Sequence, residues 1–314
     1  MIEETLDVCV SDKAACSAGV YQLHLVSASG GQLPNWEPGA HIELDLPNGL
    51  RRQYSLSSDP SDTHAWRIGV LRENESRGGS SYICDSLEIG ARLRIRGPRN
   101  NFALQTAPRY LFIAGGIGIT PLLPMMRSVE RAGSEWTLVY GGRSRSGMAF
   151  VEELSIYGAR VQVLPQDEHG FLPLENLLDG ADQETLIYAC GPEPLLSALE
   201  ASAAERKLTN LRVERFRATP VETAGDKPFQ VRFDLSDVTA TVPADRSILE
   251  IAQENDIPVM SSCSEGTCGS CQTRVIAGEV IHRDSYLSRE QQAAGTEMII
   301  CVSRAAGSRL VLEL

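Results

Sequence analysis

Four cysteines near the end of the sequence carry its clearest chemical signal. They follow the pattern C-x4-C-x2-C and, after a long gap, one more cysteine: Cys263, Cys268, Cys271 and Cys301. This spacing is typical of a plant-type 2Fe–2S cluster, in which three thiolates come from one loop and the fourth from a distant strand. The sequence therefore predicts a one-electron carrier in this part of the chain.

Two glycines in the same segment support this interpretation. Gly266 and Gly269 would let the loop adopt positive φ angles and bring backbone N–H groups close to sulfur. A structural zinc site is one alternative, but such sites usually combine two cysteine pairs, or one pair with two histidines. Only His282 lies nearby. We therefore favour a cluster over zinc or unrelated thiols.

Composition narrows the class of protein. The chain has 314 residues, a formal net charge of −12 and eight cysteines. The acidity argues against nucleic acid and anionic membrane surfaces as partners. No apolar run approaches the length of a membrane span, and the first residues lack an export signal, so we expect a cytoplasmic protein whose four other cysteines are free thiols.

The pattern of apolar residues changes twice along the chain. The first hundred residues show short alternating strands separated by turns, which predicts an antiparallel barrel. Strands then alternate with helical segments, the pattern of a parallel α/β sheet. A linker rich in Thr, Pro and Gly precedes a compact third unit that holds the four cysteines. We expect these parts at 1–106, 107–219, 220–229 and 230–314.

The α/β region opens with a possible phosphate-binding turn. An apolar strand leads into Gly115, Gly116 and Gly118, with Thr120 as the expected N-cap and Pro121 as the first helical residue. Glycines let backbone approach a diphosphate, and a helix N-terminus supplies N–H donors. An ordinary glycine-rich turn is the alternative, because the motif differs from the usual G-x-G-x-x-G.

The barrel region contains two candidate flavin contacts. Arg52 could bind a phosphate, Tyr54 could stack on a ring and Ser55 could hydrogen-bond the reactive edge of that ring. The segment Ser76–Ser81 could provide a second phosphate contact through backbone and hydroxyl groups. An edge strand and an exposed turn are the alternatives for these two motifs.

Two further motifs lie at predicted strand ends, where open α/β sheets bind ligands. The first is Cys190-Gly191-Pro192, in which Cys190 could equally be a buried, inert thiol. The second runs from Glu214 to Phe216, where the aromatic ring is either part of the core or a lid on a flavin.

Taken together, these motifs resemble the ferredoxin–NADP reductase superfamily, and the C-terminal 2Fe–2S unit makes the chain similar to phthalate dioxygenase reductase and its relatives. The resemblance implies a flavin-binding antiparallel β-barrel domain, an α/β parallel-sheet nucleotide domain and an α+β β-grasp ferredoxin domain. It implies FMN, NADH and a 2Fe–2S cluster as cofactors. It assigns flavin and nucleotide contacts to Arg52, Tyr54, Ser55, Leu56, Gly78, Gly79, Ser80, Gly115, Gly116, Gly118, Thr120, Pro121, Arg143, Cys190, Gly191, Pro192 and Phe216.

The resemblance also implies the chemistry. Ser55 and Cys190 match positions near the flavin and nicotinamide, and Glu214 matches the Glu-x-aromatic ending of the superfamily. These three are the expected catalytic residues, and we expect no essential general base. NADH releases two electrons together whereas the cluster takes one, so a flavin must divide the pair. Two features depart from the superfamily pattern: Phe216 replaces the commoner tyrosine, and a further domain follows it. Arg143 could clasp a 2′-phosphate, but relatives of this type mostly use NADH.

These observations predict the NADH-dependent reductase component of a two-component Rieske-type oxygenase, with the terminal oxygenase as partner and neither nucleic acid nor membrane. One alternative is a reductase for another acceptor, such as a diiron hydroxylase. Another is a non-catalytic redox-sensing module built on the same domains. The substrate of the partner oxygenase is not encoded in this chain.

Overall fold

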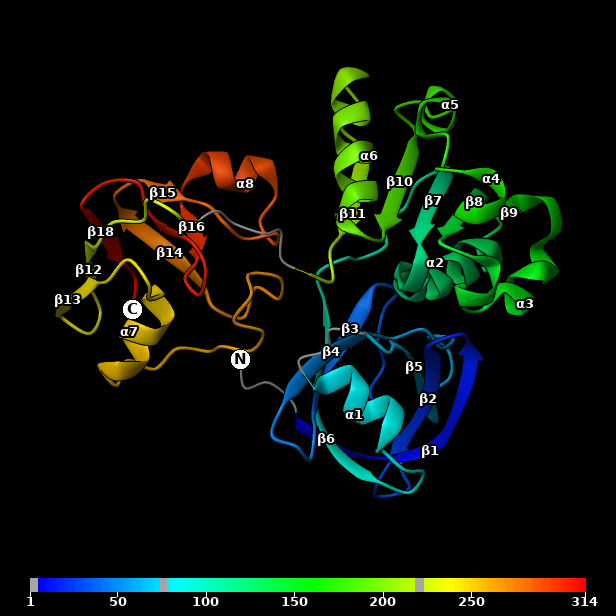
Figure 1. Cartoon of the computed structure of the whole chain (residues 1–314), viewed down its shortest axis with the longest axis horizontal. Coiled ribbons are helices and arrows are strands. Elements are labelled where there is room, and N and C mark those ends of the chain that lie inside the picture. The colour runs from blue at the N-terminus through cyan, green and yellow to red at the C-terminus, as the bar shows by residue number, and fades with distance from the viewer. Residues whose placement is uncertain (1–4, 74–77, 218–222) are drawn as a thin grey trace. The chain divides into compact units, whose positions relative to one another are not determined.

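The structure is a computed structural model that describes residues 5–73, 78–217 and 223–314. The chain divides into two compact units, Met1–Glu214 and Arg215–Leu314, each with its own core (Figure 1). The division falls after the last strand of the parallel sheet. The finer boundaries expected at 106/107 and within 220–229 stay predictions.

The first part of unit 1 is an antiparallel barrel of six strands in the order β4-β3-β6-β1-β2-β5. A bridge between Leu56 and Ile68 connects the two outermost strands and closes the sheet. A short helix, α1, lies between β5 and β6 in the chain. The bounds are β1 Thr5–Ser17, β2 Val20–Ser27, β3 Ala40–Asp45, β4 Arg51–Ser55, β5 Ala65–Leu71, α1 Gly79–Asp85 and β6 Arg92–Asn100.

Strand β5 illustrates how the sequence builds this barrel. Trp66, Ile68 and Val70 alternate along it and are fully buried in the barrel core. Side chains on a strand alternate between the two faces of the sheet, so Arg67 and Gly69 point out of the barrel. This outward face of β5 meets the α/β part of the same unit, as described below.

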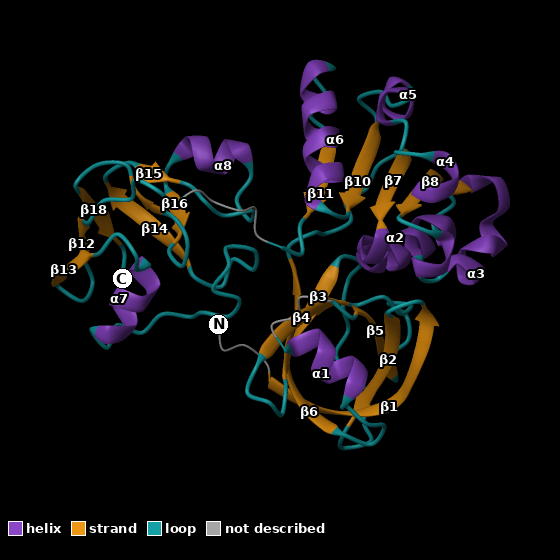
Figure 2. Cartoon of the chain, viewed as in Figure 1, coloured by secondary structure: helices purple, strands orange, loops and turns teal. Residues whose placement is uncertain are grey.

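The second part of unit 1 is a five-stranded parallel sheet in the order β11-β10-β7-β8-β9. Helices alternate with the strands along the chain (Figure 2). The strands are β7 Arg109–Gly115, β8 Glu135–Gly142, β9 Val161–Pro165, β10 Thr185–Cys190 and β11 Leu211–Glu214. The helices are α2 Ile119–Arg131, α3 Val151–Leu154, α4 Gln166–His169, α5 Leu174–Asp179 and α6 Glu193–Glu205, with 3-10 turns η1 Gly116–Gly118, η2 Arg145–Gly147 and η3 Ser155–Arg160.

Both faces of this sheet are covered. One core contains α2 with Phe112, Leu138 and Tyr188 of the strands. The opposite core contains α5 and α6 with Ile113 and Ile187. Strands buried on both faces are expected for a parallel sheet, and their carboxyl ends therefore present the loops that can bind a ligand.

Unit 2 is a mixed sheet in the order β13-β12-β18-β14-β16, in which β12 and β18 are parallel and the other pairs antiparallel. Ser247 caps α7 through a reciprocal capping box with Glu250. The elements are β12 Phe229–Phe233, β13 Val238–Val242, α7 Ile248–Glu254, β14 Gln272–Ala277, β15 Val280–Ile281, α8 Arg289–Ala294, β16 Glu297–Ile299, β17 Arg304–Ala305 and β18 Arg309–Leu312.

The predicted fold class is confirmed: the barrel sheet is antiparallel, the second sheet of unit 1 is parallel, and a mixed sheet with helices forms unit 2. The strands expected to alternate with helical segments in the α/β region form, among them β7, β8, β9 and β10. Within the three described ranges, we find no helix that is both long and apolar enough to span a membrane.

Candidate functional site

The four predicted cluster ligands gather in unit 2. The Cys263 thiol hydrogen-bonds to Cys268 and Cys301, and Cys271 hydrogen-bonds to Cys301. These contacts lower the pKa of Cys263 and Cys271 and raise the pKa of Cys268 and Cys301. None of the four is in a disulfide. Four free thiols within reach of one another are the donor set that an Fe–S cluster requires.

Glycine is required at two points of the cluster loop, as the sequence predicted. Gly266 and Gly269 have φ angles of 75° and 72°. A Cβ on Gly266 would lie 2.6 Å from Cγ2 of Val302, and one on Gly269 would lie 2.2 Å from Cζ of Tyr286. These residues therefore combine a left-handed backbone with close packing by neighbouring side chains.

Backbone amides in this loop point at sulfur. The N–H of Glu265 donates to Sγ of Cys263 at 3.3 Å, and the N–H of Ser270 donates to Sγ of Cys268 at 3.5 Å. Such donors stabilise thiolate charge and tune the reduction potential of a cluster. The loop geometry therefore fits a 2Fe–2S cluster.

In unit 1, the glycine turn after β7 packs directly against the end of β10. A Cβ on Gly118 would lie 2.2 Å from the carbonyl oxygen of Cys190, and one on Gly115 would lie 2.6 Å from Cδ of Pro192. Gly191 completes this contact, because its Cβ would lie 3.0 Å from Cα of Gly115. The two motifs that the sequence placed 75 residues apart are thus one structural feature at the carboxyl edge of the sheet.

Gly116 differs from its neighbours. Its φ is 56°, and a Cβ there would meet nothing within 4 Å. It is therefore the position of this turn with open space beside the backbone, which is what close approach of a nucleotide requires.

The predicted N-cap was wrong. Helix α2 begins at Ile119 after the 3-10 turn, with Gly118 as N-cap and without a side-chain cap. Thr120 lies inside the first turn, where its Oγ1 donates to the carbonyl of Ile117 at 3.0 Å. Pro121 is the third helical residue. The preceding 3-10 turn starts the helical path early, so the capping signature in the sequence marked a position two residues too late.

Cys190 and Glu214 are register partners at the ends of β10 and β11. Cys190 is fully buried, and burial followed by the nearby Glu214 charge raises the pKa of its thiol well above the ordinary value. Burial also raises the pKa of Glu214 to about 8, and its Oε2 is buried without a hydrogen-bond partner among the described residues. Both groups therefore hold their protons at neutral pH.

The basic loop after β8 is only partly available to a cofactor. Arg143 is exposed, and its carbonyl accepts from the Asp167 N–H at 3.2 Å. Arg145 forms two hydrogen bonds of 3.3 Å to Glu168 of α4. The Glu168 carboxylate thus already pairs with one arginine of the basic loop, which leaves Arg145 less available to a 2′-phosphate.

On the barrel, the predicted phosphate contacts come together. A Cβ on Gly79 would lie 2.3 Å from Nε of Arg52, and Nδ2 of Asn48 donates to the Gly78 carbonyl at 3.2 Å. Ser80 belongs to the same first turn of α1, where its Oγ accepts from the Glu73 N–H at 3.3 Å. One guanidinium beside the start of α1 fits an anionic group such as a phosphate.

The rest of the predicted flavin motif is more buried. Ser55 is 5% exposed, and burial raises the pKa of the Tyr54 hydroxyl. The Leu56 side chain lies in the barrel core and is fully buried. Only the backbone of Leu56 is therefore left to contact a cofactor.

Neither Phe216 nor the start of the second barrel motif lies in the described part of unit 1. Phe216 is 42% exposed and belongs to unit 2, just after the division between the units. Its proposed contact with a flavin stays a prediction. Ser76 and Arg77, the start of the second barrel motif, lie outside the described residues.

Sequence reasoning missed three charged residues that connect the two parts of unit 1. Arg67 of β5 and Arg127 of α2 both bond to Glu153 of α3. Alternation along β5 would have placed Arg67 outside the barrel, but nothing in the sequence identified its partners. Their contact depends on tertiary packing, because Arg67 precedes Arg127 by 60 residues and Glu153 by 86.

Comparison with known families agrees with this geometry. Residues 231–306 match the family described as "2Fe-2S iron-sulfur cluster binding domain", and residues 112–201 match "Oxidoreductase NAD-binding domain". An antiparallel barrel, an NAD-binding parallel sheet and a 2Fe–2S domain together define an iron–sulfur oxidoreductase. The predicted enzyme class is therefore confirmed.

Relatives extend along nearly the whole chain. The phenoxybenzoate dioxygenase subunit beta of Ectopseudomonas oleovorans is 42% identical over 284 residues, 90% of this chain and 89% of the relative. The phthalate dioxygenase reductase of Burkholderia cepacia is 34% identical over 311 residues, 97% of this chain and 96% of the relative. The chain belongs to the phthalate dioxygenase reductase family.

Solved structures support the same conclusion. Phthalate dioxygenase reductase, described as a modular structure for electron transfer from pyridine nucleotides to [2Fe–2S], matches 99% of this chain and 98% of its own with a TM-score of 0.73 and 33% identity. An intact type IV self-sufficient cytochrome P450 monooxygenase matches 99% of this chain with a TM-score of 0.90 and 41% identity. The chain spans 41% of that larger protein. The cofactors are accordingly those of the family: FMN, NADH and a 2Fe–2S cluster.

Proposed function

We propose that this chain is the NADH-dependent reductase that supplies electrons, one at a time, to the terminal component of a Rieske-type oxygenase. The observation that carries the proposal is the gathering of four free thiols, three of them on an amide-lined loop, in the same chain as an NAD-binding domain. Relatives named as reductases or subunits of dioxygenase systems support an oxygenase as the partner.

The barrel would hold FMN. Arg52 and the first turn of α1, with Gly78, Gly79 and Ser80, would bind the phosphate, because a guanidinium and backbone N–H groups converge there. Tyr54 would pack on the ring, and Ser55 would offer its hydroxyl. Thr120 would contribute from the α/β side, since its methyl group reaches the outward face of β5 at Gly69.

The carboxyl edge of the parallel sheet would hold NADH. Gly116 supplies open backbone for the diphosphate, while Gly115, Gly118 and Gly191 seat the turn against β10. Pro121 and Pro192 would border the same site, and Arg143 would lie near the adenosine ribose.

When bound, FMN takes electrons in pairs from NADH and releases them singly, which matches the one-electron capacity of the cluster. The chain's own residues bind and orient. Cys190 and Glu214 keep their protons at neutral pH because burial raises the pKa of both. They would shape the nicotinamide pocket as neutral groups, and no buried charge would oppose entry of the ring.

A second acceptor class is favoured by a specific observation. A self-sufficient cytochrome P450 monooxygenase matches 99% of this chain at 41% identity, nearly the 42% of the phenoxybenzoate dioxygenase subunit beta. A cytochrome P450 is therefore the second candidate for the terminal acceptor.

An anaerobic titration of the purified chain with NADH tests the proposal. We expect flavin absorbance to bleach, followed by a rhombic low-temperature EPR signal of a reduced 2Fe–2S centre. Bleaching without that signal would contradict the role of the four cysteines. If neither NADH nor NADPH bleached the flavin, the proposed reductase activity would be wrong.

The acceptor is tested separately by mixing the reduced chain with a purified Rieske-type oxygenase component or with a cytochrome P450 haem domain. Faster reduction of the Rieske cluster in stopped flow is the expected result. Faster reduction of haem would replace the first candidate with the second.

A further inference from the structure

A charged cluster ties the barrel to the α/β part within unit 1. Nη1 of Arg67 donates to Oε2 of Glu153 at 2.8 Å, and its Nη2 lies 3.4 Å from Oε1 of the same carboxylate. Nη2 of Arg127 also bonds to Oε1 of Glu153. The three side chains are only 12%, 18% and 29% exposed for Arg67, Arg127 and Glu153, so the shared carboxylate separates two largely desolvated guanidinium groups.

Ser57 is the second centre of this cluster. Its carbonyl accepts from Nη2 of Arg67 at 2.8 Å and from Nη1 of Arg127 at 2.9 Å. Its hydroxyl accepts from Nε of Arg67 at 3.3 Å. Ser57 is fully buried and lies two residues after Ser55. The strand that carries the flavin motif is thereby bonded to the helix that begins at the nucleotide turn.

The same junction contains a strained residue. Phe150, just before α3, has a φ of 62° although it is not glycine, a conformation that costs a bulky side chain about 1 kcal/mol or more. Its ring lies under the Arg67 guanidinium, 4.7 Å from centroid to Cζ. A Cβ on Gly69 would lie 3.4 Å from this ring and 2.8 Å from Cγ2 of Thr120. Tertiary contacts at the junction therefore hold the strained backbone in place.

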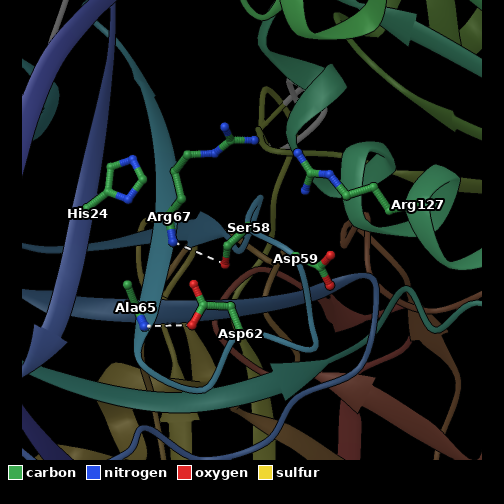
Figure 3. A pocket seen from close by; sticks show the side chains of 7 residues that line it. All are labelled: His24, Ser58, Asp59, Asp62, Ala65, Arg67 and Arg127. Carbon is green, nitrogen blue, oxygen red and sulfur yellow. Dashed lines mark hydrogen bonds between the residues drawn. The ribbon is translucent and has the colours of Figure 1, made fainter. Parts of the chain in front are cut away.

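A depression of about 280 Å³ lies beside the charged cluster (Figure 3). In Figure 3 the guanidinium groups of Arg67 and Arg127 approach each other from β5 and α2. Each guanidinium nitrogen of Arg67 already donates to a protein acceptor, so these donors serve the junction and not a ligand. The lining residues are His24, Ser58, Asp59, Asp62, Ala65, Arg67 and Arg127.

We infer that Glu153 is a positioning residue for hydride transfer, acting through Arg67 and Arg127 to fix the flavin strand against the nucleotide helix. This inference rests on the proposed function, because it assumes a flavin at Tyr54–Leu56 and a nicotinamide at the carboxyl edge of the sheet. Removing the carboxylate charge leaves two guanidinium groups facing each other with little water between them. The junction then opens, and displacements near 1 Å are enough to slow a transfer by up to ~100-fold.

The test is Glu153→Gln in the full, cofactor-loaded chain, with Glu152→Gln as the matched control. Glu152 is the neighbouring residue of the same helix and is exposed. We expect the rate of flavin bleaching at saturating NADH to fall about 10-fold in Glu153→Gln. The apparent Kd for NADH, the FMN content and the cluster EPR signal should stay within about 2-fold of the wild type, and Glu152→Gln should match it. A wild-type bleaching rate in flavin-loaded Glu153→Gln would overturn the inference.

A second variant decides the matter if Glu153→Gln does not fold. Arg127→Lys keeps the positive charge but lacks the planar guanidinium that lets Arg127 bond to Ser57 and Glu153 at the same time. We expect a fall of about 3-fold in the bleaching rate, again without a change in Kd for NADH; an unchanged rate would reject the positioning role. Failure of the proposed function is distinct, because the wild type itself would then not bleach with NADH.

Discussion

The cluster loop and the nucleotide turn both depend on glycine, but for different physical reasons. In the cluster loop, Gly266 and Gly269 have positive φ and are crowded by side chains. In the nucleotide turn, the two requirements are separated: Gly118 has an ordinary φ of −62° and is crowded by backbone, whereas Gly116 has positive φ and open space. Glycine is therefore required at Gly116 by the backbone conformation and at Gly118 by a close contact.

This difference explains why one site was easier to predict than the other. A cluster loop brings its three cysteines together by local conformation, so their spacing identifies the site. The nucleotide turn is defined by a contact with the end of β10, 75 residues further along the chain, which no local spacing encodes.

Replacing one predicted cluster ligand should abolish the function of the cluster while the function of the nucleotide turn remains. Cys268→Ser should abolish the reduced 2Fe–2S EPR signal and electron delivery to an oxygenase, because one thiolate of the set is lost. NADH-driven reduction of ferricyanide should remain near the wild-type rate, since the nucleotide turn belongs to the other unit. Loss of both activities in a folded, flavin-loaded variant would show that the two regions are not independent.

Two alanine substitutions compare contact with conformation inside the nucleotide turn. Gly118→Ala would place its Cβ 2.2 Å from the Cys190 carbonyl oxygen and 2.4 Å from the carbonyl carbon. Backbone cannot move aside as a side chain can, so we expect a loss of about 3 kcal/mol in unfolding free energy. Gly116→Ala meets no atom and should cost about 1 kcal/mol through its positive φ.

Urea unfolding followed by flavin release measures both variants. We expect the unfolding free energy to be lowest for Gly118→Ala, intermediate for Gly116→Ala and highest for the wild type. The reverse order would mean that backbone conformation, and not contact with β10, dominates this turn.

The buried carboxyl beside the same turn should make stability depend on pH. Burial raises the pKa of Glu214 from 4.5 to about 8, so the folded protein keeps a proton that the unfolded chain releases above its ordinary value. The favourable contribution is complete below pH 4.5 and is lost as pH rises towards 8. Glu214→Gln should remove this loss, worth on the order of 2 kcal/mol.

Melting temperatures at pH 5.5 and 8.5 provide the check. The wild type should lose more stability between these values than Glu214→Gln, while the exposed Glu205→Gln should behave as the wild type. Parallel pH profiles for all three proteins would show that the Glu214 carboxyl is better solvated than its buried Oε2 indicates.

Sequence patterns predicted the elements and the site residues with unequal success. Alternation along β5 and the apolar runs of β7 and β10 predicted strands, because burial on one or two faces leaves a periodic trace in the sequence. The start of α2 was misplaced, because a 3-10 turn precedes it and Thr120 bonds to Ile117 instead of capping the helix.

The junction that Arg67, Arg127 and Glu153 form could not be predicted. Each of these residues looks like an ordinary surface charge in the sequence, and only the packing of β5 against α2 and α3 desolvates and pairs them. Local periodicity specifies which face of an element is buried, but the partner across an interface depends on the whole fold.

The smallest expected effect concerns choice between NADH and NADPH. Glu168 pairs with Arg145 at 3.3 Å on an exposed surface, where such a pair contributes less than about 1 kcal/mol. Glu168→Gln should free Arg145 to meet a 2′-phosphate and raise kcat/KM for NADPH about 3-fold, with little change for NADH. The double variant Glu168→Gln/Arg145→Ala should return to the wild-type value, because the freed guanidinium is then absent. If the double variant kept the gain, the carboxylate itself would be repelling the phosphate. In either case the effect arises from a contact between the segments that follow β8 and β9, whose residues Arg145 and Glu168 are 23 positions apart, and not from the conformation of one short loop.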